Sequence, residues 1–186
     1  MGVFTVPNLL TLSRIALAPV FVVLYLSGDT RAALAVFAVA AATDVLDGLA
    51  ARALDQRSRL GTLLDPVADK VLEISALFAL WGRGQLPLWL AALVVSRDLA
   101  QLLGAIVLRG TRHRVPIAPT RIGKYATFGV VATVLVALAA PLAAAPEEAG
   151  PYVAVLGLLT AECVVLSWGQ YFLYFLRSFR DPATSF

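Results

Sequence analysis

Residues 31–52 read RAALAVFAVAAATDVLDGLAAR, and this stretch decides the fold. Residues 32–42 are all apolar, so a helix formed here is apolar on every face, as a helix is when it crosses a membrane or lies in a large core. The end of the stretch is different, because Asp44, Asp47 and Arg52 follow close together. The stretch therefore predicts a membrane-spanning helix with a charged end, and ionisable groups at membrane depth are typical of functional sites.

The composition of the whole chain points the same way. Of its 186 residues, 60% are hydrophobic and 15% are charged, whereas soluble domains average about 45–50% apolar and about 25% charged residues. These proportions exclude an ordinary soluble domain, and they exclude disorder because so apolar a chain cannot stay solvated. The net charge is +3. Because the basic residues lie between apolar stretches, they favour contact with anionic lipid and argue against nucleic acid.

Turn signals and clusters of charge divide the chain into six apolar stretches, each near the roughly 20 residues that a helix needs to cross a bilayer. They are Pro7–Leu26, Arg31–Arg52, Leu64–Trp81, Leu86–Leu108, Ile122–Ala145 and Tyr152–Leu176. We predict an all-α, polytopic membrane protein with six transmembrane helices, forming a single domain over residues 1–186. In the last stretch, we expect Glu162, Ser167 and Gln170 to pack inward as a polar strip against the other helices, with acceptor binding as the alternative.

The distribution of basic residues predicts the orientation. With six spans, all of the 15 lysines and arginines except Arg31 and Arg83 lie on the side of the N-terminus. Cytoplasmic loops carry an excess of Lys and Arg, so both termini are predicted to be cytoplasmic. The expected location is the cell inner membrane, with the ionisable residues gathered in a polar cavity that opens to the cytoplasm.

Four aspartates lie at helical spacings near that predicted cavity. Asp44 and Asp47 are three residues apart at the end of the second stretch, and Asp65 and Asp69 are four apart around the start of the third. A short link joins the two stretches, so we expect the four carboxylates to converge. Alone, each could be a helix cap or an ion-pair partner, as Asp65 before a proline illustrates. Together they predict a site for a hard divalent cation such as Mg²⁺ or Mn²⁺.

The same residues belong to a longer pattern. The stretch from Asp44 to Arg52, DVLDGLAAR, is followed by Gly61, Asp65 and Asp69, which fills every fixed position of D-x2-D-G-x2-A-R-x8-G-x3-D-x3-D. This pattern resembles the signature of the CDP-alcohol phosphatidyltransferases. The resemblance implies the transfer of a phosphatidyl group from CDP-diacylglycerol to an alcohol with release of CMP, and it implies two bound divalent ions. It also implies a homodimer.

The resemblance assigns a role to each matching position. It implies that Asp44, Asp47 and Asp65 are metal ligands, and that Asp69 is a metal ligand or the general base. It implies that the cytidine diphosphate of the donor contacts Gly48, Ala51, Arg52 and Gly61. Residues 7–14, PNLLTLSR, resemble the start of the first helix in the branches that make phosphatidylglycerol phosphate and cardiolipin. Asn8 is then a candidate for nucleotide binding, although it could equally cap the first helix.

The acceptor is predicted from basic residues outside the signature. Arg97, Arg121 and Lys124 are candidates for binding its phosphate, and the alternative is that they anchor helices at anionic lipid. We take glycerol 3-phosphate as the first expectation for the acceptor, with phosphatidylglycerol, and so cardiolipin synthesis, as the alternative. The glycerol 3-phosphate branch usually has Glu where this chain has Asp98, which keeps the alternative open. A more distant alternative is a cation-coupled membrane transporter.

Overall fold

The computed structural model describes residues 6–53, 59–110 and 120–180. These residues form helices joined by short turns and contain no strand. The helices are α1 (Val6–Leu26), α2 (Thr30–Ala53), α3 (Arg59–Gly82), α4 (Leu88–Gly110), α5 (Arg121–Ala139), the short 3-10 helix η1 (Ala140–Leu142) and α6 (Pro146–Arg180). The all-α prediction is confirmed, and each predicted apolar stretch corresponds to one α-helix, although the fifth, Ile122–Ala145, also includes η1.

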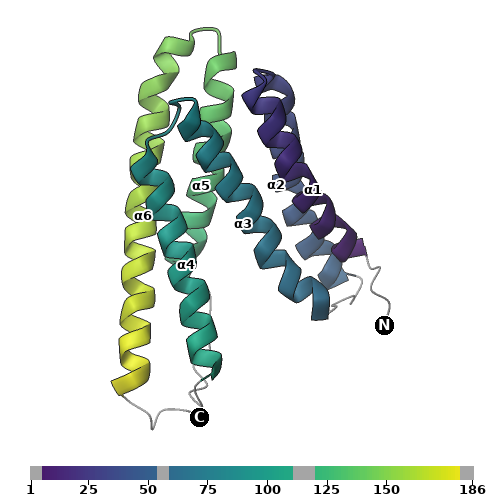
Figure 1. Ribbon diagram of the computed structural model, residues 1–186. Coiled ribbons are helices and arrows are strands. Elements are labelled where there is room, and N and C mark those ends of the chain that lie inside the picture. The colour runs from purple at the N-terminus through teal and green to yellow at the C-terminus, as the bar shows by residue number, and fades with distance from the viewer. Residues whose placement is uncertain (1–5, 54–58, 111–119, 181–186) are drawn as a thin grey trace.

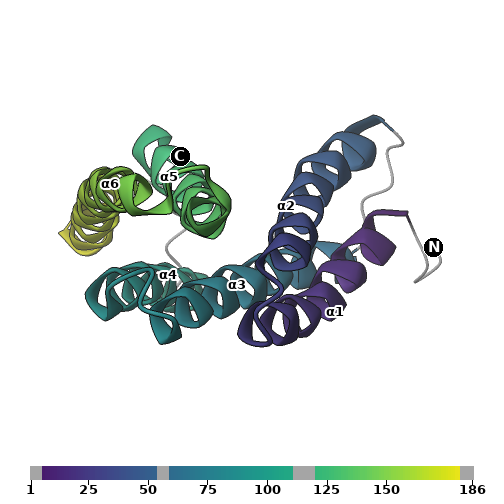
Figure 2. The same ribbon diagram turned by 90° about the horizontal axis from the view of Figure 1, so that it is seen from above.

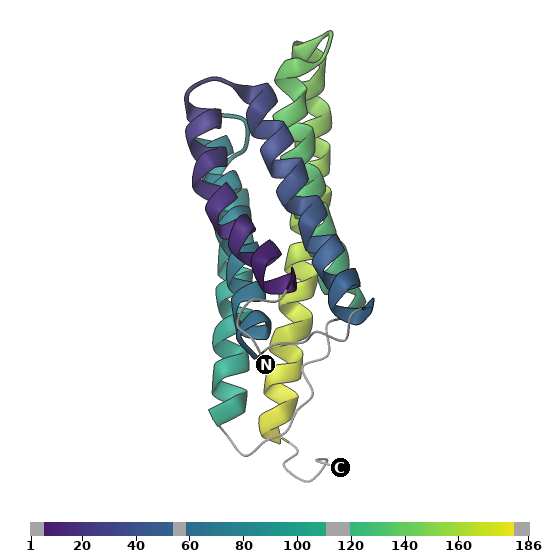
Figure 3. The same ribbon diagram turned by 90° about the vertical axis from the view of Figure 1, so that its right-hand side faces the viewer.

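Successive helices run in alternating directions, as Figures 1 and 3 show. The starts of α1, α3 and α5 and the ends of α2, α4 and α6 therefore lie at one end of the molecule, which we call the motif end because it carries the residues of the signature. The short turns between α1 and α2, between α3 and α4 and between η1 and α6 lie at the opposite end.

Within the part of the chain that the structure describes, two helical segments are long and apolar enough to cross a membrane by themselves, Arg121–Leu142 and Pro146–Tyr174. The segments Thr11–Leu26 and Thr30–Thr43 are also apolar but shorter. The six-span topology and the orientation of the termini stay predictions.

The helices pack in two groups. In the view from above (Figure 2), α1 lies against both α2 and α3, while α5 and α6 form a pair that α4 flanks. Aromatic rings fill the first group, where the ring of Phe21 lies 5.7 Å from that of Phe37 and 5.9 Å from that of Tyr25. Arg83, in the turn after α3, donates a 2.8 Å hydrogen bond from Nη1 to the backbone carbonyl of Tyr25. This bond ties α3 to α1 at the end opposite the motif.

Small residues allow α5 and α6 to pack closely. A Cβ atom placed on Gly129 would lie 2.9 Å from Thr160 Oγ1. The hydroxyl of Thr160 lies 2.9 Å from that of Thr133, one helical turn further along α5. In an apolar environment, close contact of small residues and hydrogen bonds between hydroxyl groups are the interactions that hold helices together. The first turn of α5 also lies at the candidate active site described next.

Candidate active site

The four aspartates of the signature lie on two helices. Asp44 and Asp47 lie in the last part of α2, and Asp65 and Asp69 in the first half of α3, so both pairs lie toward the motif end. Their side chains fall outside the described residues, as do those of Asn8, Gly48, Ala51, Arg52 and Gly61. Among the side chains that are described, no three acidic, histidine or cysteine residues are grouped to hold a metal ion. The roles of the signature residues therefore stay predictions.

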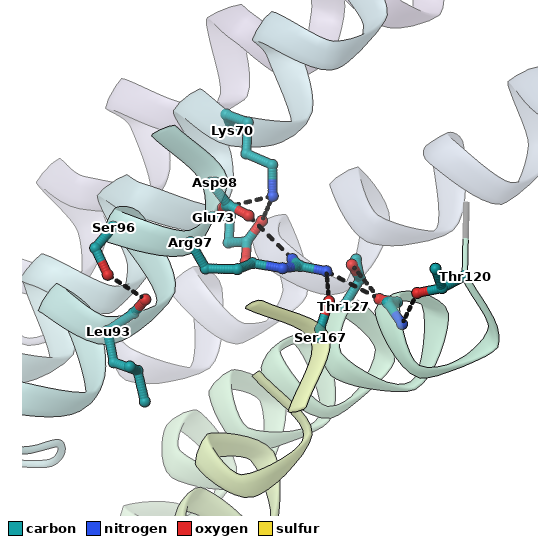
Figure 4. Close-up of polar contacts among 10 residues, drawn as sticks. Lys70, Glu73, Leu93, Ser96, Arg97, Asp98, Thr120, Thr127 and Ser167 are labelled. Carbon is teal, nitrogen blue, oxygen red and sulfur yellow. Dashed lines mark hydrogen bonds and ion pairs between the residues drawn. The ribbon is translucent and has the colours of Figure 1, made fainter. Parts of the chain in front are cut away.

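Next to the signature lies a polar cluster that the structure describes fully (Figure 4). It begins at Lys70, which follows Asp69 directly on α3. The ammonium nitrogen of Lys70 lies 2.6 Å from Glu73 Oε2 on the same helix and 2.6 Å from Asp98 Oδ2 on α4. Asp98 uses its other oxygen, Oδ1, to accept a 3.0 Å hydrogen bond from Nη1 of Arg97. One carboxylate thus joins two cations that come from different helices.

Arg97 extends the cluster to the last two helices. Its Nη2 donates to the backbone carbonyl of Gly123 at 3.1 Å and lies 3.4 Å from Ser167 Oγ on α6. Gly123 lies in the first turn of α5, and its N–H donates to Oγ1 of the N-cap residue Thr120 at 3.0 Å. A Cβ on Gly123 would come within 3.1 Å of Thr120 Oγ1 and 3.5 Å of Ser167 Oγ. A glycine therefore suits this junction, and polar contacts run from α3 through α4 to α5 and α6.

The cluster is buried and its charges balance. Arg97 is 3% exposed, Asp98 7% and Glu73 8%, while the side chain of Lys70 is 34% exposed. Two cations face two carboxylates, so no net charge has to be accommodated in this low-dielectric region. Removing one member of such a pair leaves the other charge buried without compensation, which is costly. The arrangement therefore constrains the relative positions of the four helices.

The three residues predicted to bind the acceptor substrate differ in their exposure to solvent. Arg97 is buried, and both of its terminal nitrogens contact protein groups. Arg121 and Lys124 are exposed in the first turn of α5, on either side of Gly123 in the sequence. The contact between Arg97 and the Gly123 carbonyl brings the three residues to one region. Their role in acceptor binding stays a prediction.

The polar strip predicted for α6 is confirmed only in part. Ser167 is buried against Arg97, as expected, and Gln170 is partly buried. The expectation for Glu162 is wrong, because its side chain is exposed. Thr160 and Ser167 mark the buried stripe of α6, and Glu162 lies two residues from Thr160, on the opposite side of the helix.

The ion pair between Lys70 and Asp98 is a feature of the site that the sequence does not predict. The available signals were a Lys and a Glu three residues apart on one helix and an adjacent Arg–Asp pair inside an apolar one. Neither signal identifies its partner on another helix.

Comparison with known proteins establishes the family. The family model for CDP-alcohol phosphatidyltransferase matches residues 4–169. The chain therefore belongs to the CDP-alcohol phosphatidyltransferase family, as the signature from Asp44 to Asp69 predicts.

Three curated relatives share a name. The chain is 43% identical over 124 residues to the cardiolipin synthase (CMP-forming) of Homo sapiens, covering 66% of this chain and 40% of the human protein. It is 42% identical over 123 residues to the Rattus norvegicus protein of the same name, covering 66% of this chain and 40% of that protein. It is 38% identical over 136 residues to that of Streptomyces coelicolor, covering 69% of this chain and 62% of that protein. The matches thus span less than two thirds of these relatives' own length.

Proposed function

We propose that this protein is a phosphatidyltransferase of the cardiolipin synthase type. The observation that supports it is the name shared by the human, rat and Streptomyces relatives, at 38–43% identity. In the proposed reaction, a hydroxyl oxygen of phosphatidylglycerol attacks the lipid-bearing phosphorus of CDP-diacylglycerol. The bond from that phosphorus to the oxygen of CMP breaks, and the products are cardiolipin and CMP. This proposal puts phosphatidylglycerol ahead of glycerol 3-phosphate as the acceptor, and family membership argues against the transporter alternative.

The signature residues supply the groups that this reaction needs. Asp44, Asp47, Asp65 and Asp69 would hold Mg²⁺ or Mn²⁺, since carboxylate oxygens are the ligands that these ions prefer. When bound, the ions neutralise the diphosphate and the charge that develops on the leaving CMP. Asp69 would take the proton of the acceptor hydroxyl. CDP-diacylglycerol would be bound by Gly48, Ala51, Arg52, Gly61 and Asn8. The guanidinium group of Arg52 can donate two hydrogen bonds to a phosphate.

Arg121 and Lys124 would bind the phosphodiester of the acceptor. Both side chains are exposed in the first turn of α5, where the helix dipole also favours an anion. Both are predicted to lie at the cytoplasmic surface, where the headgroup of an anionic lipid is within reach. We propose the same orientation for the whole motif end, with the acyl chains of donor and acceptor remaining in the inner membrane. A homodimer is proposed from the family alone.

An acceptor panel tests the proposal. The full-length protein, purified in nanodiscs, would receive CDP-diacylglycerol and Mg²⁺, and CMP release would be measured with phosphatidylglycerol and with glycerol 3-phosphate in parallel. We expect metal-dependent release with phosphatidylglycerol and a cardiolipin product identified by mass spectrometry. Turnover with glycerol 3-phosphate alone would overturn the cardiolipin assignment. Absence of turnover with either acceptor, for a protein that is folded and binds Mn²⁺, would argue against the enzyme itself.

A further inference from the structure

We propose that Asp98 is a positioning residue that holds the donor-binding and acceptor-binding parts of the active site in register. It does so by joining Lys70 of α3 to Arg97, which in turn holds the first turn of α5. This inference rests on the proposed function, because it concerns how the two substrates of that reaction are aligned. It assigns Asp98 a role that needs no contact with either substrate.

On the donor side, the joint fixes α3. Lys70 is the residue after Asp69, and its ammonium group is held between Glu73 and Asp98 at 2.6 Å from each. Successive residues of an α-helix are about 100° apart around its axis. A Lys70 side chain anchored to α4 therefore fixes the rotation of α3 about its axis. This rotation sets the direction in which the adjacent residue, Asp69, leaves the helix.

On the acceptor side, the joint fixes α5. The guanidinium group of Arg97 contacts the carbonyl of Gly123 at 3.1 Å, and Gly123 lies between Arg121 and Lys124 in the first turn. Asp98 orients that guanidinium through the 3.0 Å contact of Oδ1 with Nη1. A change at Asp98 therefore reaches the turn that carries the two exposed cations.

The two carboxylate oxygens of Asp98 link the donor-binding and acceptor-binding parts of the site. Oδ1 faces Arg97 and Oδ2 faces Lys70, and the residue is 7% exposed. Buried ion pairs are weak evidence for stability, but their geometry constrains which arrangement forms. Transfer of a phosphatidyl group depends on the alignment of the two substrates, and a misplacement of the reacting atoms by about 1 Å lowers the rate by about 100-fold. A loss of this alignment is therefore expected to lower kcat and to leave substrate binding unchanged.

Asp98→Asn tests the proposal in the full-length protein in nanodiscs. Asn keeps the size of the side chain but loses the charge that faces two cations. We expect kcat per folded molecule to fall by about 100-fold, while the KM values for both lipids and the Kd for Mn²⁺, measured by EPR, stay within about twofold of the parent values. The matched control is Asp29→Asn at the opposite end of the molecule, where Asp29 caps α2 and Asn caps equally well. The control should leave every parameter unchanged.

Lys70 provides a second, conservative pair of variants. Lys70→Met removes the charge and should reproduce the loss in kcat, whereas Lys70→Arg keeps a cation within reach of Asp98 and should restore most of it. Rescue by Arg separates the positioning role from a requirement for packing alone. Failure of Arg to improve on Met, together with an unchanged kcat in Asp98→Asn, would overturn the proposal.

The distance between α3 and α5 tests the relative position of these helices in the absence of substrates. Spin labels on Val67→Cys of α3 and Tyr125→Cys of α5, both exposed positions, would be placed in a Cys163→Ser background, which removes the single native cysteine. We expect Asp98→Asn to shift or broaden the distance distribution between the labels. An unchanged distribution, or a loss of activity that follows only the loss of folded protein, would overturn the proposal. If the parent protein proves inactive with phosphatidylglycerol, the proposed function fails while this measurement still tests the register.

Discussion

Gly129 of α5 lies so close to Thr160 of α6 that a Cβ atom at position 129 would be 2.9 Å from the threonine Oγ1. The close packing of the two helices therefore requires glycine, which has no side chain, at this position. Because Thr160 is also 2.9 Å from the hydroxyl of Thr133, anything that pushes Thr160 aside also disturbs that hydrogen bond.

Gly129→Ala is thus expected to destabilise the protein, by about 1–3 kcal/mol as for other overpacked contacts. The measurement is unfolding in mixed micelles followed by tryptophan fluorescence. Gly104→Ala is the matched control, because a Cβ at position 104 meets nothing within 4 Å and alanine is the better helix former. Equal effects of the two substitutions would show that close packing at Gly129 is unimportant.

The carboxylates of the signature are expected to differ in what they contribute. Asp44→Ala, Asp47→Ala and Asp65→Ala should each abolish metal-dependent CMP release and weaken Mn²⁺ binding, because each removes a proposed ligand. Chelation of the metal in the parent protein should have the same effect on turnover, and added Mg²⁺ should reverse it.

Asp69→Asn should separate binding from chemistry. An amide cannot accept the proton of the acceptor hydroxyl, so turnover should be lost while CDP-diacylglycerol still binds. Donor binding is measured directly with a fluorescent CDP-lipid, and CMP release is measured on the same preparation. Turnover that persists in Asp69→Asn would contradict the role of Asp69 as the base.

The exposed cations of α5 are expected to act on the acceptor alone. Arg121→Gln and Lys124→Gln together should raise the KM for phosphatidylglycerol by about tenfold, the loss of one or two charge-assisted hydrogen bonds, and leave the KM for CDP-diacylglycerol unchanged. Arg31→Gln serves as the control, since Arg31 is exposed in the first turn of α2 at the opposite end. A parallel rise in both KM values would indicate general attraction of anionic lipid.

Arg97 should not tolerate lysine. Its two terminal nitrogens contact Asp98, Gly123 and Ser167 in different directions, and a single ammonium group cannot reproduce this fork. Arg97→Lys should lower stability by about 1–3 kcal/mol as buried polar groups lose partners, and Arg97→Ala by about 3–5 kcal/mol because Asp98 loses a buried counter-charge. The same unfolding measurement checks both, with exposed Arg31→Lys as the neutral control.

The helices and the family can be predicted from the sequence because the features that indicate them are local. An apolar run of about 20 residues needs a helix to satisfy its backbone in a membrane, and the spacing from Asp44 to Asp69 is fixed along the chain. Contacts between helices are not local. Lys70 meets Asp98 from 28 residues away, and Arg97 meets Ser167 from 70 residues away. The sequence does not show which side of α6 faces the core, since both sides are apolar, and the expectation for Glu162 is wrong for this reason.

The contacts of Arg97 also bear on how the chain is made. Asp98 is synthesised immediately after Arg97, whereas Gly123 and Ser167 follow 26 and 70 residues later. A nascent α4 therefore carries its guanidinium with a counter-ion already beside it, while the acceptors on α5 and α6 are still to be translated. The contact with Ser167 forms only when the final helix docks, so the terminal nitrogens of this arginine acquire their last partner at the step that completes the helix bundle.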